Sequence, residues 1–357
     1  MRRLATPCAV LSLAAVAVAA DRFAATGGDI LITPIVDAGG LQVTCNPGAL
    51  AAGWTGTDLV RCGVAIADQA VSDVRLSCAD LPAGASCTFE PAVVRPRPGA
   101  DAGVNVRVSY TEGLPAGRHV VRILAETNGV SAAATVAIDK DLNTVSSRCP
   151  TADEIKAIDH DLKLVFESDP TRGTRECAEV RELTVMQSRV YRGLATMRRL
   201  QFTEPLPWTS EPVYRWLTKS VRGVRFRGGN DNSSCCGPDG LISVRAVVES
   251  SPNGSQMGFS LAITQSATMP TDFRLLASFL QLLVHEARHN NGKPHTCGTK
   301  DRSIREMGAW GAAYMCQQWL AERTEPGLSP PNVRASLLQA TEQICRGQIC
   351  EQPCLAQ

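Results

Sequence analysis

The spacing of apolar residues changes once along this chain, and that change constrains the fold more than any other feature. Before residue 140, apolar residues recur at every second position in short runs that Gly, Pro and Asp separate. After Pro150 they recur at intervals of three and four residues. The first pattern is typical of strands with one buried face, and the second is typical of amphipathic helices. A chain of 357 residues is long enough for two domains, and we place the boundary between Asp139 and Pro150.

Residues 28–140 are expected to form an all-β domain. The runs that predict strands are residues 30–32, 41–45, 74–78, 104–108, 119–124 and 133–138. Several short strands that turn residues separate indicate a β-sandwich. No group with catalytic chemistry stands out in this part of the sequence.

Two segments of the all-β part resemble bacterial immunoglobulin-like modules. One is LSCADLPAGASCTFEP at residues 76–91, and the other is LPAGRHVV at residues 114–121. The resemblance implies an immunoglobulin-like β-sandwich over residues 28–140 and implies almost nothing about function. Within such a module we expect two disulfides, Cys78–Cys87 and Cys45–Cys62.

Residues 150–357 are expected to form an α+β domain. Thr151 and Glu154 stand three residues apart just before the apolar Ile155 and Ile158, which is typical of a helix start. The other segments follow from the same patterns: helices over residues 183–200, 211–221 and 273–291, and strands over residues 224–227, 241–248 and 259–264. A small sheet among several helices makes an α+β domain.

The first twenty residues are typical of an export signal. Arg2 and Arg3 supply a positive start, and residues 9–20 are an apolar run of small side chains. That run has 12 residues, whereas a membrane-spanning helix needs about 20. We therefore expect a signal peptide over residues 1–20, no membrane span, and a mature protein that is secreted or held in the periplasm or cell envelope.

Cysteine usage agrees with export. Of the 14 cysteines, Cys8 lies in the signal, which leaves 13. So many cysteines in an exported chain indicate disulfides, and the odd number leaves one thiol that is free or pairs between molecules. We expect Cys297 to pair with Cys316, and the cysteines of residues 345–354 to form disulfides rather than to bind zinc.

Three of the five histidines in the chain fall within the eleven residues 285–295, whose sequence is HEARHNNGKPH. His285 and His289 are four residues apart, so on a helix both imidazoles project from one face about one turn apart. Two ligands of a single tetrahedral zinc ion need that separation. Glu286 is adjacent but angled to one side, where it can act as a general base without being a ligand.

The residues after His289 can bring a third imidazole back to the same place. Gly292 allows the left-handed conformation that ends a helix, and Pro294 prevents the helix from resuming. His295 can then serve as the third zinc ligand, which leaves the fourth position to water. The pattern HExxHxxGxxH is similar to the zinc signature of the metzincins, a clan of extracellular metallopeptidases within the zincins. The resemblance implies that the three histidines bind zinc and that Glu286 is the base.

A second possibility for the third ligand is left open. Metzincins follow the motif with a tight turn that bears a methionine, for which Met307 and Met315 are the candidates. We expect residues 303–322 to form one continuous helix, which does not fit such a turn. Gluzincins take their third ligand from a Glu on a later helix, and Glu306 stands 17 residues beyond His289. The third ligand is therefore His295 or, failing that, Glu306.

The sequence favours a secreted zinc metallopeptidase that hydrolyses peptide bonds, with Glu286 as the general base. The partner would be a protein or peptide substrate, with cell-wall or surface contact through the all-β domain. The net charge of +1 gives no reason to expect nucleic acid as a partner. Two alternatives are a zinc hydrolase of other amides and a non-enzymatic envelope or adhesion protein with a structural zinc site.

Overall fold

The fold is described from a computed structural model. The structure describes residues 40–67, 73–169, 171–227, 241–248, 259–261 and 273–351. The chain divides into two compact units, Met1–Thr33 and Pro34–Gln357. The expected signal peptide and the expected strand at residues 30–32 lie outside the described residues. All the described residues belong to the second unit.

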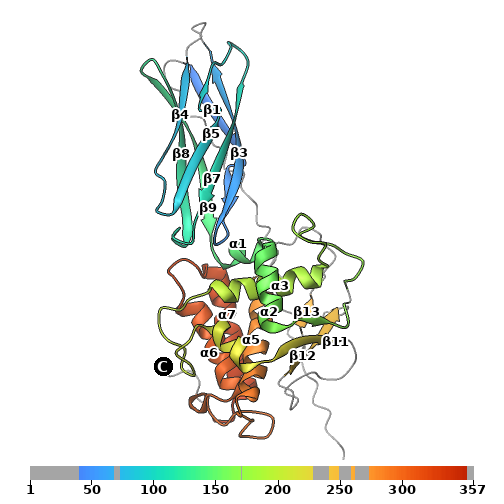
Figure 1. Cartoon of the computed structure of the whole chain (residues 1–357). Helices are drawn as coiled ribbons and strands as arrows, with labels where there is room; N and C mark the ends of the chain where they lie inside the picture. Colours follow the sequence, from blue (N-terminus) through green and yellow to red (C-terminus); the bar gives the residue numbers. More distant parts are fainter. Residues whose placement is uncertain are drawn as a thin grey trace, which may run out of the picture. The chain divides into compact units, whose positions relative to one another are not determined.

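Residues 41–140 form two sheets (Figure 1). One sheet has the strand order β1 (Leu41–Asn46), β3 (Gly56–Ile66), β7 (Ala102–Tyr110), β5 (Ala85–Glu90), and all its pairs are antiparallel. The other has the order β2 (Ala49–Ala51), β9 (Val130–Lys140), β8 (Gly117–Thr127), β4 (Val74–Ala79), β6 (Val93–Val94). Its pairs are antiparallel except β2 with β9. Five of the expected strands lie within β1, β4, β7, β8 and β9.

The two sheets share one hydrophobic core. Along β7, Val104, Val106 and Val108 are buried while the residues between them are more exposed, as one buried face requires. Val121 and Ile123 of β8 belong to the same buried cluster. The alternating pattern of the sequence therefore marks the core of this part.

Both disulfides expected in this part are present. Cys45–Cys62 joins residues directly opposite each other on β1 and β3. Cys78–Cys87 joins β4 of one sheet to β5 of the other. The second disulfide thus links the two sheets covalently across their shared core.

Residues 142–348 are mainly helical and include a small parallel sheet that lies beside the helices (Figure 1). The helices are α1 (Leu142–Ser147), α2 (Ala152–Leu162), α3 (Val185–Arg199), α4 (Val213–Ser220), α5 (Phe273–Asn290), α6 (Ala309–Glu322) and α7 (Pro331–Gln348). The strands, in sheet order, are β10 (Val165–Phe166), β11 (Gly223–Arg227), β12 (Leu241–Val248) and β13 (Phe259–Leu261). The expected cap of α2 is confirmed, because Thr151 and Glu154 each accept a hydrogen bond from the other's backbone N–H.

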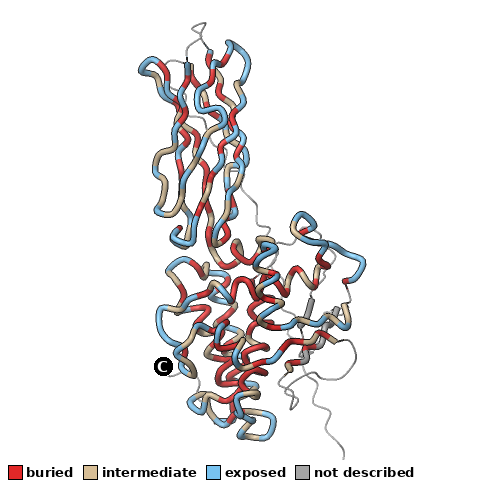
Figure 2. Tube along the Cα trace, in the orientation of Figure 1, coloured by how far each residue is buried: buried red, intermediate tan, exposed pale blue. Residues whose placement is uncertain are grey.

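Helix α5 lies at the centre of this part. It packs against α1, α3, α4, α6 and α7. The five apolar residues at helical spacing are all buried, as expected: Phe273, Leu276, Leu280, Leu283 and Ala287. Phe279 and Val284 are buried as well, so α5 is covered on more than one side (Figure 2). A helix buried in this way holds the side chains near its C-terminal end in fixed positions.

The expectation of one continuous helix over residues 303–322 is wrong. A short 3₁₀ helix, η1 (Ile304–Glu306), is followed by Met307 with φ +46°, and α6 begins only at Ala309. The physical reason is the tight space around Gly308. A Cβ on that residue would lie 2.4 Å from a carboxylate oxygen of Asp301, which approaches the backbone where the helix would have continued.

The expected Cys297–Cys316 disulfide is also wrong. Cys297 pairs with Cys350, and Cys316 is a buried free thiol. Cys316 belongs to the core cluster around α5, whereas Cys297 lies in the loop that contacts the end of α7. A further disulfide joins Cys149 to Cys177. Within the described residues, no helix is long and apolar enough to cross a membrane.

Candidate metal centre

The candidate metal centre starts at the C-terminal end of α5. His285 and Glu286 are each 5% exposed, and His289 is partly exposed. The ring centroids of the two histidines lie 4.9 Å apart, because one helical turn separates them. The helix therefore presents both imidazoles on one face, as the spacing predicted.

The chain turns back sharply after His289. Gly292 has φ +73°, and its N–H donates to the carbonyl of His289 at 2.9 Å. The N–H of Lys293 donates to the carbonyl of Arg288 at 3.3 Å. This pattern of hydrogen bonds around a left-handed glycine closes a helix, as expected for Gly292. The reversal brings His295 back towards the face that carries the other two histidines.

The three imidazole rings form one cluster. The His295 ring centroid lies 5.3 Å from that of His285 and 4.6 Å from that of His289. One nitrogen from each ring can be chosen so that all three lie within 4.8 Å of one another. Nitrogen ligands of a tetrahedral zinc ion would lie about 3.3 Å apart, so small side-chain rotations would complete the cluster.

Two of the rings are oriented by a hydrogen bond at the nitrogen that faces away. His289 Nδ1 lies 2.9 Å from the carbonyl oxygen of Lys293, and His295 Nδ1 lies 3.0 Å from Oδ1 of Asp301. Since a carbonyl or carboxylate oxygen only accepts, Nδ1 donates in both contacts. The lone pair of each neutral ring then resides on Nε2, where a metal ion can bind.

The electrostatic surroundings of His285 and His289 favour their neutral forms. Burial, together with the neighbouring His289 and His295, lowers the pKa of His285 to about 3. Burial and His295 also lower the pKa of His289. Neutral imidazole is the form that binds metal, so both histidines of α5 favour the form that a cation requires.

Glu286 follows His285 on α5 and is buried in an environment of low polarity. Burial raises the pKa of its carboxyl group to about 8. Its Oε2 is buried and has no hydrogen-bond partner within the described part of the chain. A pKa of about 8 keeps this group mostly protonated at neutral pH while no cation is bound, and a cation held by the neighbouring histidines would favour the ionised form that can accept a proton from water.

Trp310, in the first turn of α6, packs against the histidine cluster. The ring of Trp310 lies 4.1 Å from the ring of His285 and is stacked on that of His295 at 6.1 Å. The indole N–H donates to the carbonyl of Thr299 at 3.2 Å. Arg288 donates from Nε to the carbonyl of Met307 at 2.7 Å, which ties α5 to the turn before α6. The sequence patterns did not single out Trp310 or Arg288.

The alternative ligand lies elsewhere. Glu306 accepts a hydrogen bond from the hydroxyl of Thr296 and is exposed, and it does not belong to the group of clustered ligand atoms. One other group with ligand chemistry occurs among the described residues, and it consists of Cys149, Cys177 and Glu179. Its two sulfurs form a disulfide and are not thiolates.

The donor set fits a zinc ion. Three neutral imidazoles are ligands that zinc favours, and three protein ligands are the number found at catalytic zinc sites. In the described ranges no fourth His, Cys, Asp or Glu joins the three histidines. The buried Nδ1 of His285 and Oε2 of Glu286, both without hydrogen-bond partners there, mark a polar interior that a cation and its water would satisfy.

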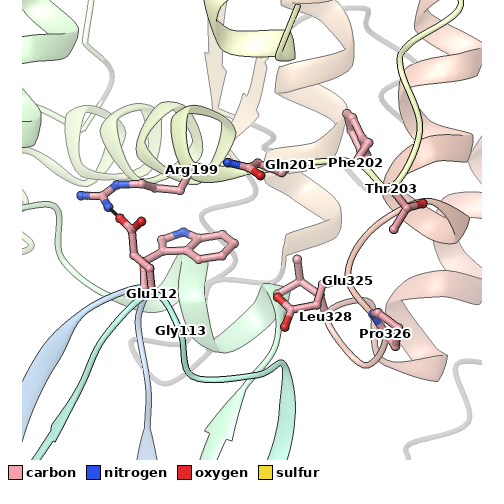
Figure 3. Close-up of a pocket in the computed structure, with 10 residues that line it drawn as sticks. Glu112, Gly113, Arg199, Gln201, Phe202, Thr203, Glu325, Pro326 and Leu328 are labelled. Carbon is pink, nitrogen blue, oxygen red and sulfur yellow. Dashed lines mark ion pairs between the residues drawn. The ribbon is translucent and has the colours of Figure 1, made fainter. Parts of the chain in front are cut away.

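A cavity of about 580 Å³ lies away from the three histidines (Figure 3). Trp54, Phe202 and Glu325 are among the residues that line it. Its charged groups are engaged with protein partners: Arg199 pairs with Glu112, and Glu325 accepts from the Ala116 N–H at 2.9 Å. Nothing in this cavity resembles the chemistry of the histidine cluster.

Comparison with known proteins adds little to this geometry. No protein-family model matches the chain, and no curated protein matches it. Among solved structures, the chain is similar to the FixG-related protein from Vibrio parahaemolyticus, with 14% sequence identity and a TM-score of 0.25. The match covers 29% of this chain and 98% of the other. So low a score carries no argument about fold or function.

Proposed function

We propose that this protein is a zinc-dependent peptidase whose metal is held by His285, His289 and His295. The observation that carries the proposal is the convergence of three imidazole nitrogens within 4.8 Å, at the end of a helix that also carries the buried Glu286, whose Oε2 has no hydrogen-bond partner among the described residues. A structural zinc site is usually closed by four protein ligands, whereas the cluster found among the described residues has three. The remaining position would be open to water and substrate.

Each residue has a separate task in this proposal. The three histidines bind the ion, and zinc bound there would polarise the substrate carbonyl and lower the pKa of a bound water to about 7. Glu286 accepts the proton of the attacking water and can pass it to the leaving amine. The low polarity around Glu286 strengthens its interaction with the charge that develops nearby. The buried Trp310 ring shields one side of His285 from solvent.

The proposal includes a place of action outside the cytoplasm. Disulfides such as Cys45–Cys62 and Cys297–Cys350 persist in oxidising compartments and are rare where thiols are kept reduced. We place the protein in the secreted or envelope fraction, with the immunoglobulin-like part holding substrate or cell wall and the zincin-like part carrying the zinc.

Peptide turnover by the purified, zinc-loaded protein tests this function. Wild type, Glu286→Gln and the matched control Glu342→Gln on α7 are compared on casein and on a library of short peptides. Loss of the general base is expected to lower kcat by at least about 100-fold, while the control keeps wild-type activity. Equal activity of wild type and Glu286→Gln would contradict the role of Glu286.

The same experiment separates the alternatives. If the protein binds zinc but neither wild type nor Glu286→Gln cleaves any peptide, assays on cell-wall crosslinks and other amides decide between a different hydrolase and a structural zinc site. A structural site is expected to leave Glu286→Gln as inert as wild type on every amide.

A further inference from the structure

Asp301 is the most deeply buried charged residue near the metal centre. It is 0% exposed and lies in the loop between His295 and η1. Its Oδ1 accepts from Nδ1 of His295 at 3.0 Å, and its Oδ2 accepts from the N–H of Gly311 at 2.9 Å. Both carboxylate oxygens therefore have donors, one on a candidate ligand and one in the first turn of α6.

The backbone of Asp301 is anchored independently of its side chain. Its N–H donates to the carbonyl of Gln348 at 3.1 Å, and its carbonyl accepts from the N–H of Cys350 at 3.0 Å. The Cys297–Cys350 disulfide ties the same loop to the same segment at the end of α7. The carboxylate of Asp301 is thus held by α6, and its backbone is held by the end of α7 and the segment that follows it.

The carboxylate of Asp301 lies close against the backbone of Gly308, just before α6. A Cβ on Gly308 would lie 2.4 Å from Oδ2 and 2.7 Å from the carboxyl carbon of Asp301. Gly308 has φ −67°, which any residue can adopt, so glycine is needed here for space and not for its backbone angles. A side chain at residue 308 would push the carboxylate away from His295.

We propose that Asp301 is a positioning residue that holds His295 in the tautomer and orientation required for zinc binding. This inference rests on the proposed function. With Asp301 accepting at Nδ1, the proton of the neutral ring stays on Nδ1 and the lone pair stays on Nε2. The buried negative charge also makes the imidazole a stronger donor to a cation. Loss of a carboxylate that accepts a hydrogen bond from a metal-binding histidine typically weakens metal binding by about 10-fold to 100-fold.

Asparagine at residue 301 separates positioning from simple packing, because it has nearly the same shape. Its side chain has one acceptor oxygen and one donor NH₂ group, while His295 and Gly311 both donate to Asp301. If the NH₂ group turns to His295, the ring must place its proton on Nε2, where zinc would bind. If it turns to Gly311, two N–H groups face each other at the start of α6.

The experiment compares Asp301→Asn with wild type and with Asp169→Asn. Asp169 fixes a turn before α3 by accepting from Thr171 at 2.8 Å, so it is a matched control outside the histidine cluster. Zinc affinity is measured by competition with a chromophoric chelator. The imidazole tautomers of the metal-free proteins are read from ¹⁵N chemical shifts at about pH 8, where histidine side chains are neutral. Asp301→Asn is expected to weaken zinc binding by about 10-fold to 100-fold and to move the proton of His295 away from Nδ1, while the His289 tautomer stays unchanged.

Gly308→Ala supplies a second variant if Asp301→Asn fails to fold. The added Cβ displaces the carboxylate, so zinc binding is expected to weaken in the same direction. Unchanged affinity and an unchanged His295 tautomer in folded Asp301→Asn or Gly308→Ala would overturn the positioning role. If wild type itself binds no zinc, the proposed function fails. The tautomer of His295 in the metal-free protein would then still show whether Asp301 controls it.

Discussion

Replacement of Glu286 by glutamine is expected to stabilise the metal-free protein, and increasingly so as the pH rises. The carboxyl group is 5% exposed, and burial raises its pKa from 4.5 to about 8. A raised pKa in the folded state means that folding favours the protonated form. The stability contributed by that form is complete below pH 4.5 and is lost as the pH rises through about 8.

The size of the effect follows from the shift in pKa. Each unit corresponds to about 1.4 kcal/mol, so full ionisation of the buried group costs about 5 kcal/mol. Between about pH 5 and about pH 8.5, the free energy of unfolding of wild type should fall by about 4 kcal/mol relative to Glu286→Gln. Glutamine has the same shape and no charge, and both proteins carry the same histidines, so the difference isolates Glu286.

Urea unfolding of the chelator-treated proteins, followed by tryptophan fluorescence, measures this difference. The midpoint of Glu286→Gln should exceed that of wild type at the higher pH and approach it at the lower pH. A difference in unfolding free energy that stays constant within about 1 kcal/mol over this range would refute the reasoning, because it would mean that water solvates the Glu286 carboxylate in the folded protein.

Two further outcomes are expected. Cys297→Ser removes the disulfide two residues beyond His295 and should weaken zinc binding in chelator competition, because the loop that carries His295 is then no longer linked to the end of α7. The control Cys78→Ser should leave zinc affinity unchanged. Equal zinc affinities of the two variants would contradict a role of the Cys297–Cys350 disulfide in zinc binding. The metal-free Glu286→Gln protein, in which the opposing titration of Glu286 is absent, should lose thermal stability as the pH falls from 6.5 towards 3, because the lowered pKa of His285 means that folding favours the neutral ring. Adding His285→Gln to this variant should reduce that loss. A pH-independent melting temperature of Glu286→Gln in calorimetry would exclude a buried neutral His285.

The alternating pattern of the sequence predicted five of the nine strands of the first part and missed β2, β3, β5 and β6. β3 does alternate, with Val60, Cys62 and Val64 buried and the more exposed Arg61 and Gly63 between them, yet it was not among the predicted strands. Every residue of β5 is at least partly exposed, so it shows no apolar run. Such a strand is held by its pairing with β7 and by the Cys78–Cys87 disulfide.

The ligand-bearing segment was predictable because its chemistry is local. The spacing of His285 and His289 on one helix, and the glycine that ends it, are all contained within eleven residues. Asp301 carries no such signal, since an acidic residue among Lys300 and Arg302 is typical of an exposed loop. Only the packing of α6 and the end of α7 around the loop buries it.

The same dependence on tertiary contacts explains the two wrong predictions. Helical spacing continues through residues 303–322, and nothing local reveals that Asp301 occupies the space beside Gly308. The pairing of Cys297 with Cys350 instead of Cys316 depends on where the end of α7 lies, and short-range patterns do not determine this.

X-ray absorption at the zinc edge of the purified, zinc-titrated protein tests the central claim most directly. One zinc ion per chain is expected, with three imidazole nitrogens at about 2.0–2.1 Å and one oxygen from water. His295→Ala should remove one nitrogen from this set, whereas Glu306→Gln should change nothing. A protein that holds no zinc, or a spectrum with sulfur ligands at about 2.3 Å, would contradict the account.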